Sequence, residues 1–132
     1  MKRFHLIFGI LIVIVFLLTG QYMDKYLNHL HGWPDGPRML YRTRHIFILF
    51  SGLIHLVLGA YVVKRMLRWQ RILQWVGSAF LVAASVLFIA AFFYDSIRGD
   101  LSAPLSYRGV FLAAYGVLAH LLSSIRRKNS TV

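Results

Sequence analysis

Long apolar runs alternate with shorter polar connections along the whole chain. Four of these runs cover residues 4–23, 46–63, 72–93 and 109–124. At about 1.5 Å per residue, a helix of each length spans most or all of the roughly 30 Å hydrocarbon core of a bilayer. The pattern therefore predicts an all-α integral membrane protein, a four-transmembrane-helix bundle in which residues 1–132 form a single domain.

The first apolar run also has features of a secretory signal, because Lys2 and Arg3 precede it. A signal peptide would end in a small-x-small cleavage site, whereas residues 18–20 read Leu-Thr-Gly. The run is also longer than a usual signal core. We therefore predict that residues 4–23 are retained as the first helix.

Composition excludes an ordinary soluble domain. The chain has 132 residues, of which 58% are hydrophobic and 14% charged, and its mean hydropathy is +0.63. A soluble domain could not bury that much apolar surface. The net charge of +11 is carried by basic residues that flank the apolar runs, which favours anionic lipid headgroups as partners and not nucleic acid. The absence of cysteine excludes disulfides, thiolate metal sites and cysteine nucleophiles.

Lysine and arginine are distributed unequally between the two sides that the helices define. The N-terminus, the connection between the second and third runs, and the C-terminus carry nine basic residues. The other two connections carry six, together with all four aspartates. Because positively charged loops stay in the cytoplasm, we predict a multi-pass protein of the bacterial inner (plasma) membrane with both termini in the cytoplasm (N-in/C-in).

The two connections on the opposite side differ in content. Residues 31–37 combine glycine and proline and interrupt any helix. Pro37 suits the first turn of the next helix, so we expect the second helix to begin near Pro37, outside the membrane. The last connection contains Gly99 and Pro104, which predicts an ordered loop or a short interfacial helix.

Small residues recur at helical spacing in three of the four runs. Membrane helices pack where such residues let their backbones lie close together. We expect these positions and two histidines to face the bundle interior: Gly52, His55 and Gly59; Gly77, Ala84 and Ala91; Gly109, Ala113, Gly116 and His120. The first run has few small residues, so we expect it to be the most lipid-exposed helix or a site of self-association.

His55 and His120 are ionisable side chains that we place deep within the spans. Burial of an imidazole in a membrane is unfavourable unless it is hydrogen-bonded, paired or ligated. We predict that each is neutral and bonds a neighbouring helix, through its backbone or a side chain such as Ser85 or Tyr115. Proton or ligand handling is a further interpretation.

Haem b is the cofactor that these histidines could hold, as two axial ligands across a bundle. Counted from the expected start of each helix, however, His55 and His120 differ in depth by roughly 6 Å, and we identify no further buried histidine. We therefore predict no cofactor, with haem b as the alternative.

A second candidate site lies on the opposite side from the termini. Arg38, Arg42 and His45 recur at i, i+4 and i+7, and Arg108 directly precedes the last run. Guanidinium groups match carboxylate and phosphate in two-point geometry, so these residues could bind an anion. The alternative is that they pair with the outer aspartates or with lipid phosphates.

Three histidines could also form an outer zinc or copper site. His29, His31 and His45 would be joined by Asp24 or Asp35. The spacing of these residues is weak evidence for coordination. We therefore predict no metal site.

No recognisable catalytic motif is present. The sequence lacks a glycine-rich phosphate loop, a nucleophile elbow, a metalloprotease His-Glu pair and an acidic residue within a span, so nothing indicates an enzyme. The leading hypothesis is an accessory or interaction subunit, or a self-associating bundle, with a second copy or another membrane protein as partner. The alternatives are a haem electron-transfer protein and a small anion or small-molecule transporter.

Overall fold

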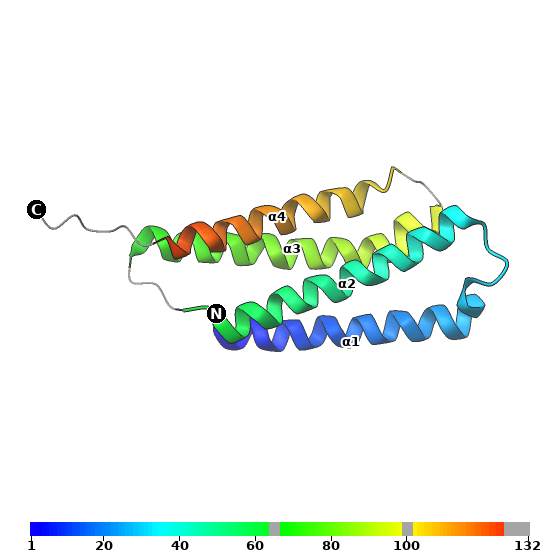
Figure 1. Cartoon of the computed structure of the whole chain (residues 1–132), viewed down its shortest axis with the longest axis horizontal. Coiled ribbons are helices and arrows are strands. Elements are labelled where there is room, and N and C mark those ends of the chain that lie inside the picture. Colours follow the sequence, from blue (N-terminus) through cyan, green and yellow to red (C-terminus); the bar gives the residue numbers. More distant parts are fainter. Residues whose placement is uncertain (64–66, 99–101, 126–132) are drawn as a thin grey trace, which may run out of the picture.

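The computed structural model describes residues 1–63, 67–98 and 102–125, and these are almost entirely helical. The elements are α1 (Lys2–Leu27), the short 3-10 helix η1 (Asn28–Leu30), α2 (Asp35–Tyr61), α3 (Arg68–Arg98) and α4 (Pro104–Ser124) (Figure 1). Each of the four long helices is long and apolar enough to cross a membrane. The predicted all-helical architecture of four membrane-length helices is confirmed.

The helices form two antiparallel hairpins that lie side by side (Figure 1). α1 packs on α2, α3 packs on α4, and α2 joins the hairpins by packing on α3. The start of α1, the end of α2, the start of α3 and the end of α4 lie together at one end of the molecule (Figure 1). We name it the basic end, since Lys2, Arg3, Arg68 and Arg71 belong to it. Several residues of the predicted charge bias lie outside the described residues: Lys64, Arg65, Asp100, Arg126, Arg127 and Lys128.

Proline and aspartate set the starts of two helices. α2 begins at Asp35, two residues before the predicted start at Pro37. The carboxylate of Asp35 in the first turn is favourable beside the positive end of the helix dipole. α4 begins at Pro104, where the missing N–H of proline costs nothing because first-turn N–H groups have no partner within a helix. Both helices therefore extend beyond the apolar runs that predicted them.

Glycines let the helices of each hairpin lie close together. A β-carbon added at Gly59 in α2 would be 2.6 Å from Leu6 Cγ in α1. One added at Gly116 in α4 would be 2.9 Å from the carbonyl oxygen of Gly77 in α3. All the small residues and histidines predicted to face the interior are buried, which confirms that assignment.

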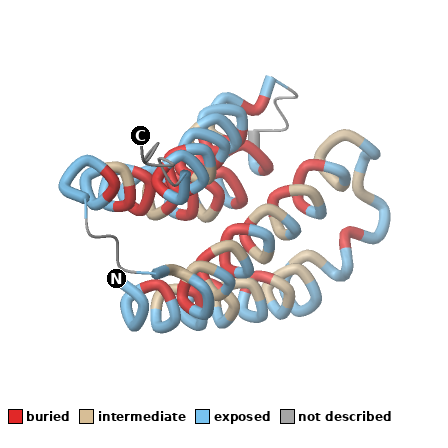
Figure 2. The backbone as a smooth tube through the Cα atoms, turned by 60° about the vertical axis from the view of Figure 1, so that its left-hand side comes forward, coloured by how far each residue is buried: buried red, intermediate tan, exposed pale blue. Residues whose placement is uncertain are grey.

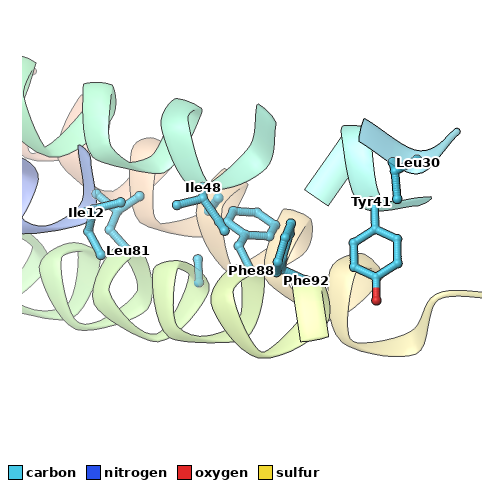
Figure 3. Packing of buried hydrophobic residues seen from close by; sticks show 9 residues of the cluster. Ile12, Leu30, Tyr41, Ile48, Leu81, Phe88 and Phe92 are labelled. Carbon is cyan, nitrogen blue, oxygen red and sulfur yellow. The ribbon is translucent and has the colours of Figure 1, made fainter. Parts of the chain in front are cut away.

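The apolar core lies where the two hairpins face each other. Figure 2 shows the buried positions on the facing sides of the helices and the exposed positions on the outside. Ile12, Ile48, Leu81, Phe88 and Phe92 belong to this core (Figure 3). α1 is the least buried of the four candidate spans, as predicted for the most exposed helix.

Candidate functional site

Four polar side chains, one from each long helix, meet toward the basic end. We name them the histidine cluster: His5 from α1, His55 from α2, Ser78 from α3 and His120 from α4. The relative exposures are 0% for His5 and His55, 6% for Ser78 and 9% for His120. The cluster is the place where all four long helices are joined by polar contacts.

Hydrogen bonds connect the cluster in a chain. Nδ1 of His5 lies 2.8 Å from Nδ1 of His55. Nε2 of His5 lies 2.9 Å from Ser78 Oγ, which in turn lies 3.3 Å from Nε2 of His120. Ser78 also donates its hydroxyl hydrogen to the carbonyl oxygen of Gln74 at 2.7 Å. Ser78 is therefore the hub that joins α1 and α4 to α3.

The positions of the hydrogens follow from counting donors. A serine hydroxyl has one hydrogen and two lone pairs, and the hydrogen of Ser78 is used on Gln74. His5 and His120 must then each donate from Nε2 to Ser78 Oγ. A neutral His5 with hydrogen on Nε2 accepts at Nδ1, so His55 donates from Nδ1. No other arrangement of neutral imidazoles makes all four hydrogen bonds.

Two nitrogens of the cluster are left as bare lone pairs by this arrangement. They are Nε2 of His55 and Nδ1 of His120, and both are buried without a hydrogen-bond partner. An unpaired buried polar atom is unfavourable and calls for an explanation. The cluster is thus more than a saturated interhelical contact.

Aromatic and glycine neighbours hold the rings in place. The rings of His5 and His55 stack with centroids 5.0 Å apart and an interplanar angle of 26°. Phe8 packs edge-on against His55 at 4.7 Å. On the other side, a β-carbon at Gly77 would lie 2.9 Å from Cδ2 of His120, so the absence of a side chain at Gly77 is what admits that ring.

The structure brings the two predicted histidines into one cluster, and it corrects the expected depths and partners. The helix ends place His55 six residues before the end of α2 and His120 four residues before the end of α4, a difference of about 3 Å. Ser85 bonds the Leu81 carbonyl of its own helix, and Tyr115 is 55% exposed. Neither named partner contacts a histidine. The partners are His5 and Ser78, which the sequence analysis did not single out.

The haem alternative requires two imidazoles that face each other across an open slot. The connection from His55 to His120 instead runs through His5 and Ser78. His5 is hydrogen-bonded to His55 and to Ser78, and Ser78 is hydrogen-bonded to His120. His5 also contacts the edge of His120, with ring centroids 5.9 Å apart. This packing does not fit a macrocycle between His55 and His120.

The predicted anion-binding arginines lie apart from the cluster, toward the opposite end. Arg38 pairs with Asp35 one turn earlier in α2. Arg42 and Arg108 are exposed. Within the described residues, these three arginines share no common partner.

His45, the fourth residue of that prediction, ties α2 to α1. Its Nδ1 lies 3.0 Å from Thr19 Oγ1, and its ring stacks on Phe16 with centroids 4.0 Å apart. His29, of the predicted zinc site, pairs with Asp24 at 2.5 Å. Among the residues that the structure describes, no three histidine or acidic side chains converge as metal ligands.

Two buried charged side chains, Asp95 and Arg44, lie near the end opposite the basic end, and the sequence analysis did not predict them. Asp95 of α3 is 1% exposed and accepts hydrogen bonds from the backbone N–H and the hydroxyl of Ser106 at 3.1 and 3.0 Å. Arg44 of α2 is 6% exposed and lies within electrostatic range of Asp95. Asp95 thus satisfies a free N–H in the first turn of α4, and Arg44 supplies a nearby positive charge.

An apolar cleft separates α2 from α4. It consists of two hollows of about 570 and 500 Å³ that share Phe50, Ile54 and Val117 in their walls. The hollow nearer the basic end reaches Tyr61 and Ser124, and the other reaches Phe47 and Val110. We name the two hollows together the α2–α4 cleft.

His120 lines this cleft. A β-carbon built on Gly77 of α3 would lie 2.9 Å from Cδ2 of His120. The Cδ2 edge of the ring therefore faces α3. Nδ1 is on the opposite edge of an imidazole ring, so the bare nitrogen faces away from α3. The ring of His120 therefore forms part of the wall of an apolar cleft, while its unpaired Nδ1 is itself buried.

Comparison with known proteins identifies no relative. No protein-family model, curated protein or solved structure matches the chain. The function has to be argued from the geometry of the cluster and the cleft.

Proposed function

We propose that this chain is a non-catalytic, multi-pass protein of the bacterial inner membrane, oriented N-in/C-in, that binds a lipid-soluble molecule in the α2–α4 cleft. The ligand has a long apolar tail and a head with one hydroxyl group. The observation that carries the proposal is that the His120 ring lines an apolar cleft while its buried Nδ1 lacks a hydrogen-bond partner. A small rotation of the ring would bring this nitrogen to the cleft. A hydroxyl donates the one hydrogen bond that this nitrogen lacks.

The depth of His120 suits an amphipathic ligand. It lies four residues before the end of α4, about 6 Å from that end of the helix. A molecule with a polar head near the membrane surface and an apolar tail would place its head at this level. The tail would then follow the cleft past Val117 to Val110, about 15 Å along α4.

The apolar walls favour a neutral ligand. Most of the residues around the cleft are aliphatic or aromatic, and burial of an ion against them would be costly. Ser123 and Ser124 use their hydroxyl hydrogens on the carbonyls of His120 and Leu121. The two serines therefore have no hydroxyl hydrogen left to donate to a ligand, whereas Nδ1 of His120 is an acceptor without a partner.

The test compares two probes of similar length, one with a hydroxyl hydrogen to donate and one with a methyl group in its place. The protein is reconstituted in lipid nanodiscs, with its histidines labelled with ¹⁵N, and titrated with hexadecanol or with hexadecyl methyl ether. We expect hexadecanol to shift the Nδ1 resonance of His120 and to bind about fivefold more tightly, since one neutral hydrogen bond contributes about 1 kcal/mol. Equal affinity for both probes, or an unchanged His120 resonance, would show that the proposal is wrong.

A matched pair of variants separates the cleft from the histidine. Val117→Trp fills the junction of the two hollows and leaves all four residues of the cluster unchanged, and we expect it to abolish binding of hexadecanol. Leu122→Trp adds the same side chain at an exposed position of α4 outside the cleft, and we expect no effect. Loss of binding in both variants would indicate non-specific partition.

A second candidate is supported by the length of the cleft. The α2 wall extends from Phe47 to Tyr61, about 21 Å of helix, which is longer than the roughly 15 Å thickness of one leaflet. A transmembrane helix of a second copy could occupy such a cleft, in agreement with the predicted interaction subunit or self-associating bundle. In that case native mass spectrometry should find oligomers of the wild type and of Leu122→Trp, and monomers of Val117→Trp.

A further inference from the structure

A third hollow, of about 480 Å³, lies at the basic end between the starts of α1 and α3 and the end of α2. Its walls are Met1, Lys2, Val62, Val63, Arg71, Gln74 and Trp75. We name it the basic hollow. It shares Val62, Val63 and Gln74 with the α2–α4 cleft, and its other four residues do not line that cleft.

The charges around the basic hollow have one sign. Lys2 and Arg71 come from different helices, and both side chains are exposed. No acidic residue lines the hollow, and no aspartate or glutamate occurs in residues 1–23 or 36–94. An anion that enters the hollow therefore meets two basic groups and no repelling carboxylate.

Two helices also point their N-terminal ends toward this hollow. α1 begins at Lys2 and α3 begins at Arg68, one turn before Arg71. The N-terminal end of a helix carries a partial positive charge, which is favourable for an anion within the first turn. The helix ends add to the attraction of the basic side chains.

The remaining walls suit the interface of a membrane. Trp75 is 67% exposed and lies beside the basic groups, a position typical of tryptophan at headgroup level. Gln74 is held in place, because its Nε2 donates to the carbonyl of Val63 at 2.9 Å. Val62 and Val63 give the hollow an apolar side.

We propose that the basic hollow binds the phosphate group of an anionic phospholipid, with Lys2 and Arg71 as its ligands. Arg71 supplies two parallel donors for two phosphate oxygens, and Lys2 supplies a compact positive charge from the other side. Basic pockets at the ends of transmembrane helices recognise lipid headgroups in this way. The acyl chains extend along Val62, Val63 and Trp75 into the bilayer. The same phosphate chemistry would accept a free phosphate ion, and the experiment distinguishes the two sources.

The experiment measures lipid retention by native mass spectrometry of the full chain in detergent. Phosphatidylglycerol and phosphatidylcholine with the same acyl chains are added in a series of concentrations. We expect phosphatidylglycerol to be retained more tightly, and Lys2→Gln or Arg71→Gln to weaken its binding about fivefold each, the effect of one basic residue near an anionic lipid. Phosphatidylcholine should be retained equally by all variants.

Arg68→Gln is the matched control, because it removes the same charge from the same end of α3 without lining the hollow. We expect it to bind phosphatidylglycerol like the wild type. If Arg68→Gln and Arg71→Gln weaken binding equally, the attraction comes from diffuse charge and the proposal fails. Failure here would leave binding of hexadecanol to the α2–α4 cleft untouched.

Calorimetric titration with inorganic phosphate tests whether the hollow binds a free phosphate ion instead of a phospholipid. Under the proposal, millimolar phosphate gives no saturable binding, since no acyl chain contacts the valines. Saturable phosphate binding that depends on Lys2 and Arg71, without preference for phosphatidylglycerol, would overturn the lipid assignment. Absence of binding by both ligands would overturn the site altogether.

Discussion

Replacement of Ser78 by alanine tests whether the histidine cluster holds the two hairpins together. Ser78 accepts from His5 of α1 and from His120 of α4, so Ser78→Ala removes two interhelical hydrogen bonds. Such bonds contribute about 0.6 kcal/mol each on average in a membrane protein and about 1 to 2 kcal/mol in model peptides. We therefore expect the free energy of unfolding to fall by about 1 to 4 kcal/mol.

Ser85→Ala is the matched control for this variant. Ser85 lies in the same helix, is 0% exposed, and donates to the Leu81 carbonyl of α3 itself. Its hydroxyl joins no other helix, so we expect a change below about 0.5 kcal/mol. Both variants replace a buried serine of α3 with alanine. A difference between their free energies of unfolding therefore reports the interhelical hydrogen bonds of Ser78.

The assay is equilibrium unfolding in mixed micelles, in which sodium dodecyl sulfate replaces a mild detergent and circular dichroism reports the loss of helix. Equal losses for Ser78→Ala and Ser85→Ala would refute the assignment of Ser78 as the hub. An independent check is ¹⁵N spectroscopy of the wild type. We expect hydrogen on Nε2 of His5 and His120 and on Nδ1 of His55, and the reverse pattern would refute the donor count.

Three further outcomes are expected. Gly59→Leu should loosen the packing of α1 on α2 and lower the detergent melting temperature, whereas Ala60→Leu at the neighbouring exposed position should not. His55→Gln, which keeps a donor and an acceptor, should be milder than His55→Leu by about 1 kcal/mol. If the purified protein shows a Soret band that both His55 variants abolish equally, the haem alternative is correct. A cysteine at Asn129 should resist an impermeant maleimide in intact cells, and labelling there would reverse the predicted orientation.

The number and order of the helices could be predicted from the apolar runs, because lipid leaves no alternative to a helix for a single span. The helix ends could be predicted only in part: Pro37 indicated the start of α2 to within two residues, whereas the start of α4 was predicted five residues too late. Hydropathy detects where side chains become polar, whereas a helix continues as long as its backbone hydrogen bonds do. α2 therefore starts at Asp35, well before the apolar run at residue 46, and α4 starts at Pro104 instead of residue 109.

Half of the histidine cluster could be predicted, since His55 and His120 interrupt long apolar runs. His5 was missed because it is the second residue of the first apolar run, two positions after Arg3, and therefore resembles part of a polar terminus. A signal was nevertheless present. His5, Gly9, Ile12 and Thr19 are the buried residues of α1, and their spacing of i, i+4, i+7 and i+14 places them on one face. That face is the one that packs on α2.

The choice of Ser78 over Ser85 as a partner could not be made from sequence. The two serines are seven residues apart in α3, so they lie on the same face about two turns apart. Which of them meets a histidine depends on how far α3 is shifted along its axis relative to α1 and α4. That shift is set by close packing across helices, such as the contact of Gly77 with Gly116.

The two bare nitrogens of the cluster have the same chemistry and different surroundings, and this difference determines what each can do. Nε2 of His55 and Nδ1 of His120 are both buried, and the whole His55 ring is 0% exposed. Nδ1 of His120 belongs to a ring in the wall of a cleft between helices that do not pack on each other. A small rotation of the His120 ring would therefore expose its nitrogen to a ligand in the cleft, whereas binding at His55 would require the hairpins to separate.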